Sequence, residues 1–558
     1  MLIKELPPEI LKSIAERLSR RSLRIALCVC RSWNNAMLPE LYTSVIIYAR
    51  RQFDLFTRSL ERSPRVGRLV RKLYLRLDLE NDTFSLLARL CPFLVEIDTL
   101  SQDWDRLNYF SKCKDLKKAC IHFRPRVPRR WPPHFLRDTM TSLSFHTVDC
   151  SEWMDVLTKL SSLECVRIFL AINNAHLHGN MSCTQLEKLH QCLPRLRDLT
   201  LNRVAIYGDL PEPITPCDTV RLLCLKLNHG SRFGEYFARK YTHLEMLHLD
   251  ATYSDLIDVE TQIKPLARSC GKLKSLTVIE NGPSVYSKFL NVLQGTAAPL
   301  SNFKDDGYDE PWKITTISSF RETLSEICIA IETESSLQQI INLLKDCPSL
   351  TDLSLIYSQG RFNLDLILDE LNGLTKLTLS ADSIGLMKND NGCIQQRLRS
   401  FTAKSTIVQE AVFDYLMRCC QRLSSLEWHY CGGNCPSFTI YYTNPSLKLL
   451  DIKHYEDAIF KITRLNEEER VREWNHRYYG AEQDEMKGFT EWYMYDNESP
   501  FKKLKRTEIE ETVAKYKRYK EHELHAKSRG KRISAQKPII SIICHWVDII
   551  RINANYVI

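Results

Sequence analysis

The chain has 558 residues, of which 44% are hydrophobic and 26% charged, and this composition excludes a protein that is disordered throughout. The formal net charge of +9 is too small over this length to indicate a nucleic-acid or membrane partner, unless the basic residues are clustered. The N-terminus lacks a basic segment followed by an apolar core, so no secretion signal is predicted. The strongest apolar run, 539–547, is interrupted by His545 and is too short for a membrane helix. We therefore expect reduced thiols and a protein of the cytoplasm, the nucleus or both.

Residues 5–42 carry apolar side chains at helical spacing. Pro7 and Pro8 suit the first turn of a helix whose apolar stripe runs from Ile10 to Leu18. A second helical segment is expected from Ser22, a plausible cap, through Trp33. Together the two segments hold more apolar surface than so short a domain can bury, so part of it should contact a partner.

The residue order in this region is more specific than its amphipathicity. Leu-Pro-Pro-Glu-Ile-Leu at 6–11, with Val-Cys-Arg-Ser-Trp at 29–33, resembles an F-box. A helical cap on a repeat array would explain amphipathic helices but not this order. The resemblance implies docking onto a SKP-type adaptor and, through it, a cullin-RING ubiquitin ligase. It also implies that Ile14 and Leu27 pack between the helices and that the adaptor-facing residues are Leu6, Pro7, Ile10, Leu11, Val29, Cys30 and Trp33.

A pattern of the form apolar-x-x-apolar-x-apolar recurs in sixteen copies about 25 residues apart, of which those at Met140 and Leu300 are weak members. Its copies begin at Val70, Leu94, Leu116, Met140, Leu163, Leu196, Leu222, Leu244, Leu273, Leu300, Leu324, Leu350, Leu374, Leu398, Leu423 and Leu447. The last three residues of each copy alternate, as in a strand with one buried face, and stretches such as 335–347 between copies have helical spacing. Because one such unit cannot bury its apolar face alone, neighbouring units must stack into a solenoid.

The array resembles leucine-rich repeats, most closely the irregular repeats of F-box proteins of the fungal type. The Asn or Cys expected after each strand is mostly absent, so the repeat subclass stays open. The predicted fold is α/β: an N-terminal helical F-box, then a solenoid with a parallel β-sheet on its concave face and helices outside. The expected parts are an F-box (1–45), a linker or N-terminal cap (46–66), the solenoid (67–455), a charged, partly helical or disordered tail (456–537) and an apolar capping segment (538–558).

If the strand leucines face the core, the side chains between them line the concave sheet. These side chains change chemistry from copy to copy, which suits recognition of a protein surface, although any single one can be an ordinary solvated residue. The candidates for binding a protein target are Lys72, Tyr74, Arg76, Asp198, Asn202, Met246, His248, Asp250, Glu427 and His429.

Cysteine also follows the repeat. Cys91, Cys113, Cys270, Cys347 and Cys420 each precede the first leucine of a copy by three residues, and Cys192 precedes Leu196 by four. A position that recurs with the fold favours a buried structural role over metal binding or redox chemistry. The segment 429–435 holds one His and two Cys but lacks a second pair at zinc-finger spacing, so no metal site is predicted.

The basic residues form two clusters. Residues 50–76 hold nine Lys or Arg against two acidic residues, and residues 502–532 hold twelve against five. The second cluster lies in a helix-favouring, highly charged tail, where Tyr516 and Tyr519 also permit an RNA- or phosphate-binding interpretation. Solvated helix is the simpler interpretation of the tail.

No motif for phosphate, zinc-protease, nucleophile-elbow or dinucleotide chemistry occurs, so neither a catalytic site nor a cofactor is predicted. The predicted function is a noncatalytic substrate receptor of an SCF-type (SKP-cullin-F-box) E3 ubiquitin ligase. Two alternatives remain: an F-box scaffold that does not direct degradation, and nucleic-acid binding through the basic tail.

Overall fold

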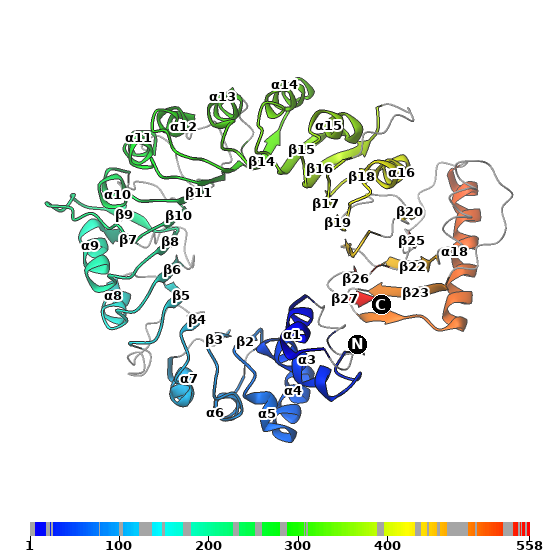
Figure 1. Cartoon of the computed structure of the whole chain (residues 1–558), viewed down its shortest axis with the longest axis horizontal. Helices are drawn as coiled ribbons and strands as arrows, with labels where there is room; N and C mark the ends of the chain where they lie inside the picture. The colour runs from blue at the N-terminus through cyan, green and yellow to red at the C-terminus, as the bar shows by residue number, and fades with distance from the viewer. Residues whose placement is uncertain are drawn as a thin grey trace. The chain divides into compact units, whose positions relative to one another are not determined.

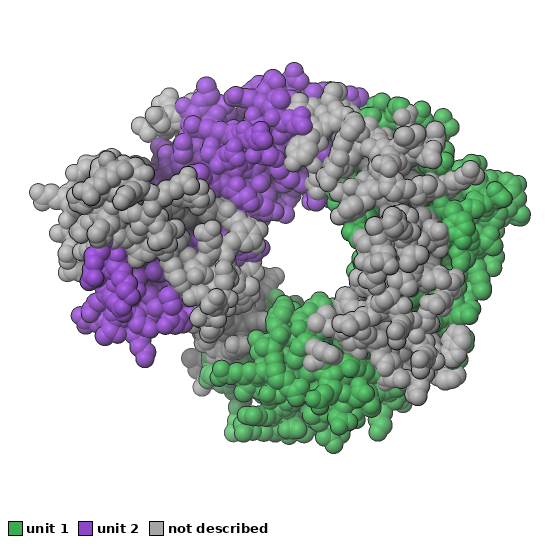
Figure 2. All heavy atoms as spheres, turned by 180° about the vertical axis from the view of Figure 1, so that it is seen from behind, with its two compact units in different colours: residues 1–301 green, residues 302–558 purple. Residues whose placement is uncertain are grey.

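The structure is a computed structural model of the whole chain. It describes residues 6–17, 23, 26–77, 79–99, 104–121, 137–147, 151–170, 180–226, 234–250, 259–279, 287–305, 307, 311–387, 396–429, 437–442, 446–454, 458–465, 489–496, 499–527, 539–544, 547, 549–552 and 555–557. These residues form two compact units, 1–301 and 302–558, each treated by itself below (Figure 2). No helix among the described residues is long and apolar enough to cross a membrane.

The first unit begins with two packed helices, α1 (Pro8–Arg17) and α3 (Arg31–Thr43). Their shared core consists of Leu11, Ala15, Leu23, Ala26 and Met37, and Ile14 and Leu27 pack against it as expected. The second helical segment expected from Ser22 to Trp33 is not continuous, because the chain turns at 27–29 and Cys30 is extended at the start of α3. Ser22 itself lies outside the described residues.

A parallel sheet follows, in which each strand pairs with the next along the chain. Its strands are β1 (Ser44–Ile47), β2 (Lys72–Leu75), β3 (Glu96–Thr99), β4 (Lys118–Ile121), β5 (Ser142–Thr147), β6 (Cys165–Leu170), β8 (Asp198–Asn202), β10 (Leu222–Lys226), β11 (Met246–Asp250) and β12 (Ser275–Ile279). A separate pair consists of β7 (Asn180–Ser182) and β9 (Ala205–Tyr207).

Helices between these strands cover one face of the sheet and leave the other face open (Figure 1). They are α4 (Arg50–Arg62), α5 (Pro64–Gly67), α6 (Asn81–Leu90), α7 (Trp104–Asn108), α8 (Ser151–Leu157), α9 (Cys183–Cys192), α10 (Gly234–Lys240), α11 (Val259–Ser269) and α12 (Ser287–Gln294), with a 3₁₀ turn at Tyr109–Lys112. The predicted fold of N-terminal helices and a parallel-sheet solenoid is confirmed. Since β1 pairs with β2, the array starts earlier than residue 67, before α4 and α5.

The second unit repeats this arrangement. Its parallel strands are β13 (Asn302–Asp305), β14 (Glu326–Ile331), β15 (Asp352–Asn363), β16 (Lys376–Gly385), β17 (Ser400–Lys404), β19 (Ser425–His429), β21 (Leu449–Lys453) and β26 (Ile549–Ile552). The short β18 (Ile407–Val408) pairs with β16, and β27 (Asn555–Val557) pairs antiparallel with β26. The helices are α13 (Pro311–Phe320), α14 (Glu334–Leu344), α15 (Leu364–Glu370) and α16 (Glu410–Cys419).

The strand leucines form the core in the predicted register, with one exception. Fifteen of the predicted first residues are buried, but Leu222 is only half-buried. In that copy Val220, Leu223 and Leu225 point into the core, and Leu222 lies opposite Asp198 and Met246 of the flanking strands. The predicted start is therefore wrong by two residues. Starting this copy at Val220 places it 24 residues from both Leu196 and Leu244.

The recurring cysteines lie at the turn between a helix and the next strand. Cys113, Cys270 and Cys420 are buried, and each accepts a hydrogen bond through its backbone carbonyl from the leucine three residues later, at 2.9–3.1 Å. Cys192 is only half-buried, because Leu193 takes that position in its copy. Burial raises the pKa of the Cys270 and Cys420 thiols to about 12. A buried structural role is what this geometry supports.

The expectation that the cysteines are all reduced differs from the structure in one place. Cys419, the last residue of α16, is disulfide-bonded. The five recurring cysteines are free thiols.

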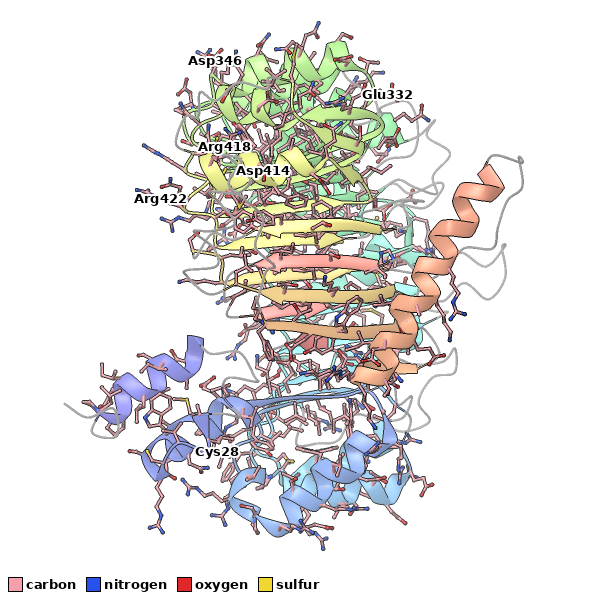
Figure 3. All side chains as sticks on the ribbon, turned by 90° about the vertical axis from the view of Figure 1, so that its right-hand side faces the viewer. Cys28, Glu332, Asp346, Asp414, Arg418 and Arg422 are labelled. Carbon is pink, nitrogen blue, oxygen red and sulfur yellow. The ribbon has the colours of Figure 1, made fainter. Side chains whose placement is uncertain are left out.

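The segment after β21 differs from the charged tail expected over 456–537. Four of its strands join β20 (Ser437–Tyr442) in a second sheet of order β20-β25-β22-β23-β24. These are β22 (Ala458–Arg464), β23 (Phe489–Asp496), β24 (Ser499–Lys503) and β25 (Ile539–Cys544). The helix α18 (Arg506–Lys527) lies beside this sheet, where Ile509 packs on Ile459 and Leu504 (Figures 1 and 3). The apolar residues of β22, which are buried at nearly every position, explain why this part of the segment forms a sheet, whereas charged residues predominate in α18.

After this inserted sheet the chain returns to the repeat array. The strand β26 pairs in parallel with β21, placing Ile549 opposite Leu449, and Ile550 and Ile552 are fully buried. Val547, Ile550 and Ile552 therefore match the repeat pattern one further time. This copy is missed by sequence reasoning because it starts at Val547, 100 residues after Leu447, which is four times the ordinary step.

Candidate protein-binding surfaces

Apolar side chains at the N-terminus remain accessible beside the small helical core. Ile10 on α1 is 49% exposed and Val29 in the turn before α3 is 56% exposed, while Pro7 is also exposed. Leu6, Cys30 and Trp33 are half-buried; Leu6 and Trp33 pack against the core with one side. Two large exposed aliphatic residues on so small a domain suit a protein contact.

Leu11 differs from the rest of its predicted set. It is 2% exposed and lies in the core between α1 and α3, because its position on the apolar stripe of α1 faces α3. The prediction that Leu11 faces the adaptor is therefore corrected: Leu11 packs between the two helices.

Two hollows flank these residues. One, of about 470 Å³, lies between α1 and α3 and is lined by Pro8, Ala36 and Pro39 among others. The other, of about 520 Å³, is lined by the turn before α3, where the Cys28 side chain is exposed, and by Arg65 (Figure 3). Arg65 donates a hydrogen bond of 3.0 Å to Asn35, which links α3 to the first helices of the array.

A family model described as F-box-like matches residues 3–47, the same region that holds these helices. The chain carries an N-terminal F-box-like domain. The leucine-rich-repeat-like solenoid follows it directly.

The solved structures that match this chain share little sequence with it. An internalin (inlF) from Listeria monocytogenes is 13% identical, with 74% of this chain and 96% of that chain covered and a TM-score of 0.31. The mouse RP105/MD-1 complex is 13% identical, with 69% and 70% covered and a TM-score of 0.35. TM-scores this low do not allow a function to be inferred from these structures. A search of the curated proteins found no match, and the expected fungal type is not supported.

Beyond the F-box-like domain, the open face of the first strands carries a network of ion pairs. Tyr74 donates a hydrogen bond of 2.8 Å to Glu96, and Arg76 donates two, of 2.8 and 3.2 Å, to Asp98. Lys72 lies 3.7 Å from Glu96. Burial and the hydrogen bond to Glu96 raise the pKa of Tyr74 to about 12. The predicted side chains do lie on the open face, but they are paired with the next strand.

Glu96 and Asp98 were missed by sequence reasoning, although their alternation with Ile97 carries the signal. In the middle of the array, the predicted residues Asp198, Asn202 and His248 are half-buried, and Met246 is 42% exposed. Burial raises the pKa of Asp198 despite the nearby Arg167 and Arg197.

Asp250 and His429 differ from the prediction of solvent-lining residues, because both are buried. Asp250 accepts a hydrogen bond of 2.6 Å from Lys226 of the preceding strand. His429 lies 3.3 Å from Asp451 of the following strand and 3.5 Å from Glu427, which is half-buried. In both cases a hydrogen-bonding partner on a neighbouring strand accounts for the burial.

The basic tail is partly neutralised by its own carboxylates. On α18, Arg506 pairs with Glu510 at 3.2 Å and Lys515 with Glu511 at 2.6 Å. Lys502, just before the helix, pairs with Glu508 at 2.9 Å. These pairs leave less positive charge for a phosphate backbone than the sequence count suggests.

Proposed function

We propose that this chain is the substrate-recognition subunit of an SCF-type E3 ubiquitin ligase and has no catalytic role of its own. The observation that carries the proposal is an F-box-like domain with accessible Ile10 and Val29, joined to a solenoid whose sheet has one open face. The F-box-like domain would bind a SKP-type adaptor and, through it, the cullin-RING ligase. Such a ligase works in the cytoplasm or the nucleus, and we place the chain there.

The open sheet face is the proposed site for a protein target. Within the first unit, residues such as Lys72 and Met246 differ in charge and size from strand to strand, and within the second unit Glu427 adds a carboxylate. Irregular side chains on a regular sheet support recognition of one extended surface. Holding a target near the charged conjugating enzyme would accelerate ubiquitin transfer by raising the effective concentration of its lysines.

Adaptor binding is tested with lysine substitutions at exposed aliphatic positions. Ile10→Lys and Val29→Lys would each place a charge in the apolar contact and weaken binding at least tenfold, which corresponds to about 1.4 kcal/mol. Leu55→Lys is the matched control, since Leu55 is 55% exposed but lies on α4, outside the F-box-like domain. Titration of purified adaptor by calorimetry measures all three. Equal binding by Ile10→Lys, Val29→Lys and wild type would overturn the adaptor assignment.

The ligase role is tested separately from adaptor binding. In cells, the proteins that co-purify with the full chain are identified, and their abundance is compared with cells expressing Ile10→Lys. A target should accumulate when the adaptor contact is lost. If bound proteins are found whose abundance and ubiquitination do not change, the chain is a scaffold that does not direct degradation.

A further inference from the structure

We propose that Glu427, His429 and Asp451 form a binding site for a divalent cation of the zinc class on the open face of the second unit's sheet. Glu427 and His429 come from β19 and Asp451 from β21, where the parallel register sets Asp451 directly opposite Glu427. One potential ligand atom from each side chain lies within 4.8 Å of the other two.

The distances are compatible with metal coordination as well as with the hydrogen bond of 3.3 Å between His429 Nε2 and Asp451 Oδ2. His429 Nε2 lies 3.3 Å from Asp451 Oδ2 and 3.5 Å from Glu427 Oε2. Hydrogen bonds between charged groups are normally about 2.7–2.9 Å long. Ligands at the zinc bond lengths of about 2.0–2.1 Å lie about 3.4 Å apart at the corners of a tetrahedron. The two distances from Nε2 therefore fit the spacing of zinc ligands.

Burial and charge point the same way. Asp451 is fully buried and His429 is 6% exposed, while Glu427 is half-buried on the open face. Two carboxylates that converge beside an imidazole attract positive charge, and Arg551 of β26 lies opposite Asp451 in the sheet. A bound divalent cation would add two positive charges to this cluster. Lys404 and Lys453 lie opposite His429 in the flanking strands, and being partly or fully exposed they can direct their charge to solvent.

The types of ligand atom also indicate which metal ion the site would bind. One imidazole nitrogen and two carboxylate oxygens are ligands that zinc accepts, and three protein ligands leave a fourth position for water or another group. Because this position is on the open sheet face, a His, Cys or carboxylate of a bound protein could occupy it; that last step rests on the proposed function. Zinc binding itself does not, since it needs neither adaptor nor target.

Sequence reasoning could not assemble this site. His429 and Asp451 are 22 residues apart and meet only through the pairing of β19 with β21. The ligand-type residues that follow His429 in the sequence are Cys431 and Cys435, which lie outside the described residues. Asp451 is much farther along the chain.

The test uses the purified full chain, stripped of metal, and titrates Zn²⁺ by calorimetry and Co²⁺ by visible absorption. Wild type should bind one ion at this site and give the visible spectrum of tetrahedral Co²⁺ without a thiolate charge-transfer band. Glu427→Gln, which keeps the shape of a half-buried side chain, and His429→Ala should each bind at least tenfold more weakly. The matched control is Glu326→Gln, which alters an exposed carboxylate on β14 of the same sheet and should bind as wild type does.

Three results would overturn the proposal: no uptake of Zn²⁺ by wild type, equal affinity in Glu427→Gln and wild type, or a thiolate band showing that cysteines hold the ion. Circular dichroism checks that each variant is folded. If His429→Ala is unfolded, Glu427→Gln alone decides. Failure here would leave adaptor binding by the F-box-like domain untouched, because that assay uses other residues.

Discussion

Asp305 and Lys313 form an ion pair of 3.2 Å in which both side chains are completely buried. Asp305 occupies the place of the last strand leucine in the copy that begins at Leu300, and therefore points into the core. Lys313 on α13 also donates hydrogen bonds of 2.6 Å to the carbonyls of Gly307 and Ala330. The pair thus replaces an apolar contact and ties the loop after β13 to the next strand.

Breaking this pair should destabilise the second unit strongly. Lys313→Met leaves a buried carboxylate without its counter-ion, which costs about 3–5 kcal/mol. Adding Asp305→Leu to Lys313→Met should recover most of the loss, because both charges are then gone. Lys345→Met is the control: Lys345 pairs with Glu370 at 2.6 Å near the surface, and its loss should cost no more than about 1 kcal/mol. The midpoint of thermal unfolding measures each variant, and equal shifts for Lys313→Met and Lys345→Met would contradict the prediction.

A second buried network predicts sensitivity to acid. His190 lies 2.7 Å from the hydroxyl of Tyr241, and burial together with Lys240 lowers its pKa to about 3. The unfolded chain binds a proton at His190 below a pH of about 6.5, while the folded chain does not. Stability should therefore fall as the pH drops, by roughly 1.4 kcal/mol per pH unit between about 6 and 3 from this residue.

The variant His190→Gln removes the titration and keeps a hydrogen-bonding group. Its unfolding midpoint should fall less than that of wild type between pH 6.5 and pH 5, where few carboxylates titrate. His243→Gln is the control, because His243 is partly exposed beside Asp218. If the unfolding midpoint of His190→Gln depended on pH as that of wild type does, His190 would not be buried in its neutral form.

The added copy at the C-terminus gives a prediction about packing. Ile550 is fully buried in β26, so Ile550→Ala should cost about 2–5 kcal/mol, as in any other core position of the array. Ile329→Ala, in the regular strand β14, should cost a similar amount, and Ile407→Ala, at a 51% exposed side chain, should cost little. Urea denaturation compares the three. A loss for Ile550→Ala as small as that for Ile407→Ala would mean that β26 does not belong to the core.

How far the sequence predicts this protein depends on whether the information is local. Spacing along the chain is local, so the repeat and the N-terminal helices are predictable, and the alternation of Lys72 and Tyr74 with leucines places them correctly on the open face. Register across strands is not local. It decides that Asp250 is buried against Lys226 and that Asp451 meets His429.

The final prediction concerns thiol reactivity. Cys270 is buried at a repeat turn with its pKa raised to about 12, so it should hold little thiolate near neutral pH, whereas Cys28 is exposed in the turn before α3. Brief treatment of the native chain with iodoacetamide should label Cys28 first and leave Cys270 unlabelled until denaturant is added. Peptide mass spectrometry gives the extent of labelling at each cysteine, with Cys28→Ser as the control. Labelling of Cys270 as fast as Cys28 would show that the repeat turns open readily.

Because Cys28 adjoins Val29, saturating adaptor should slow the labelling of Cys28 without changing that of Cys270.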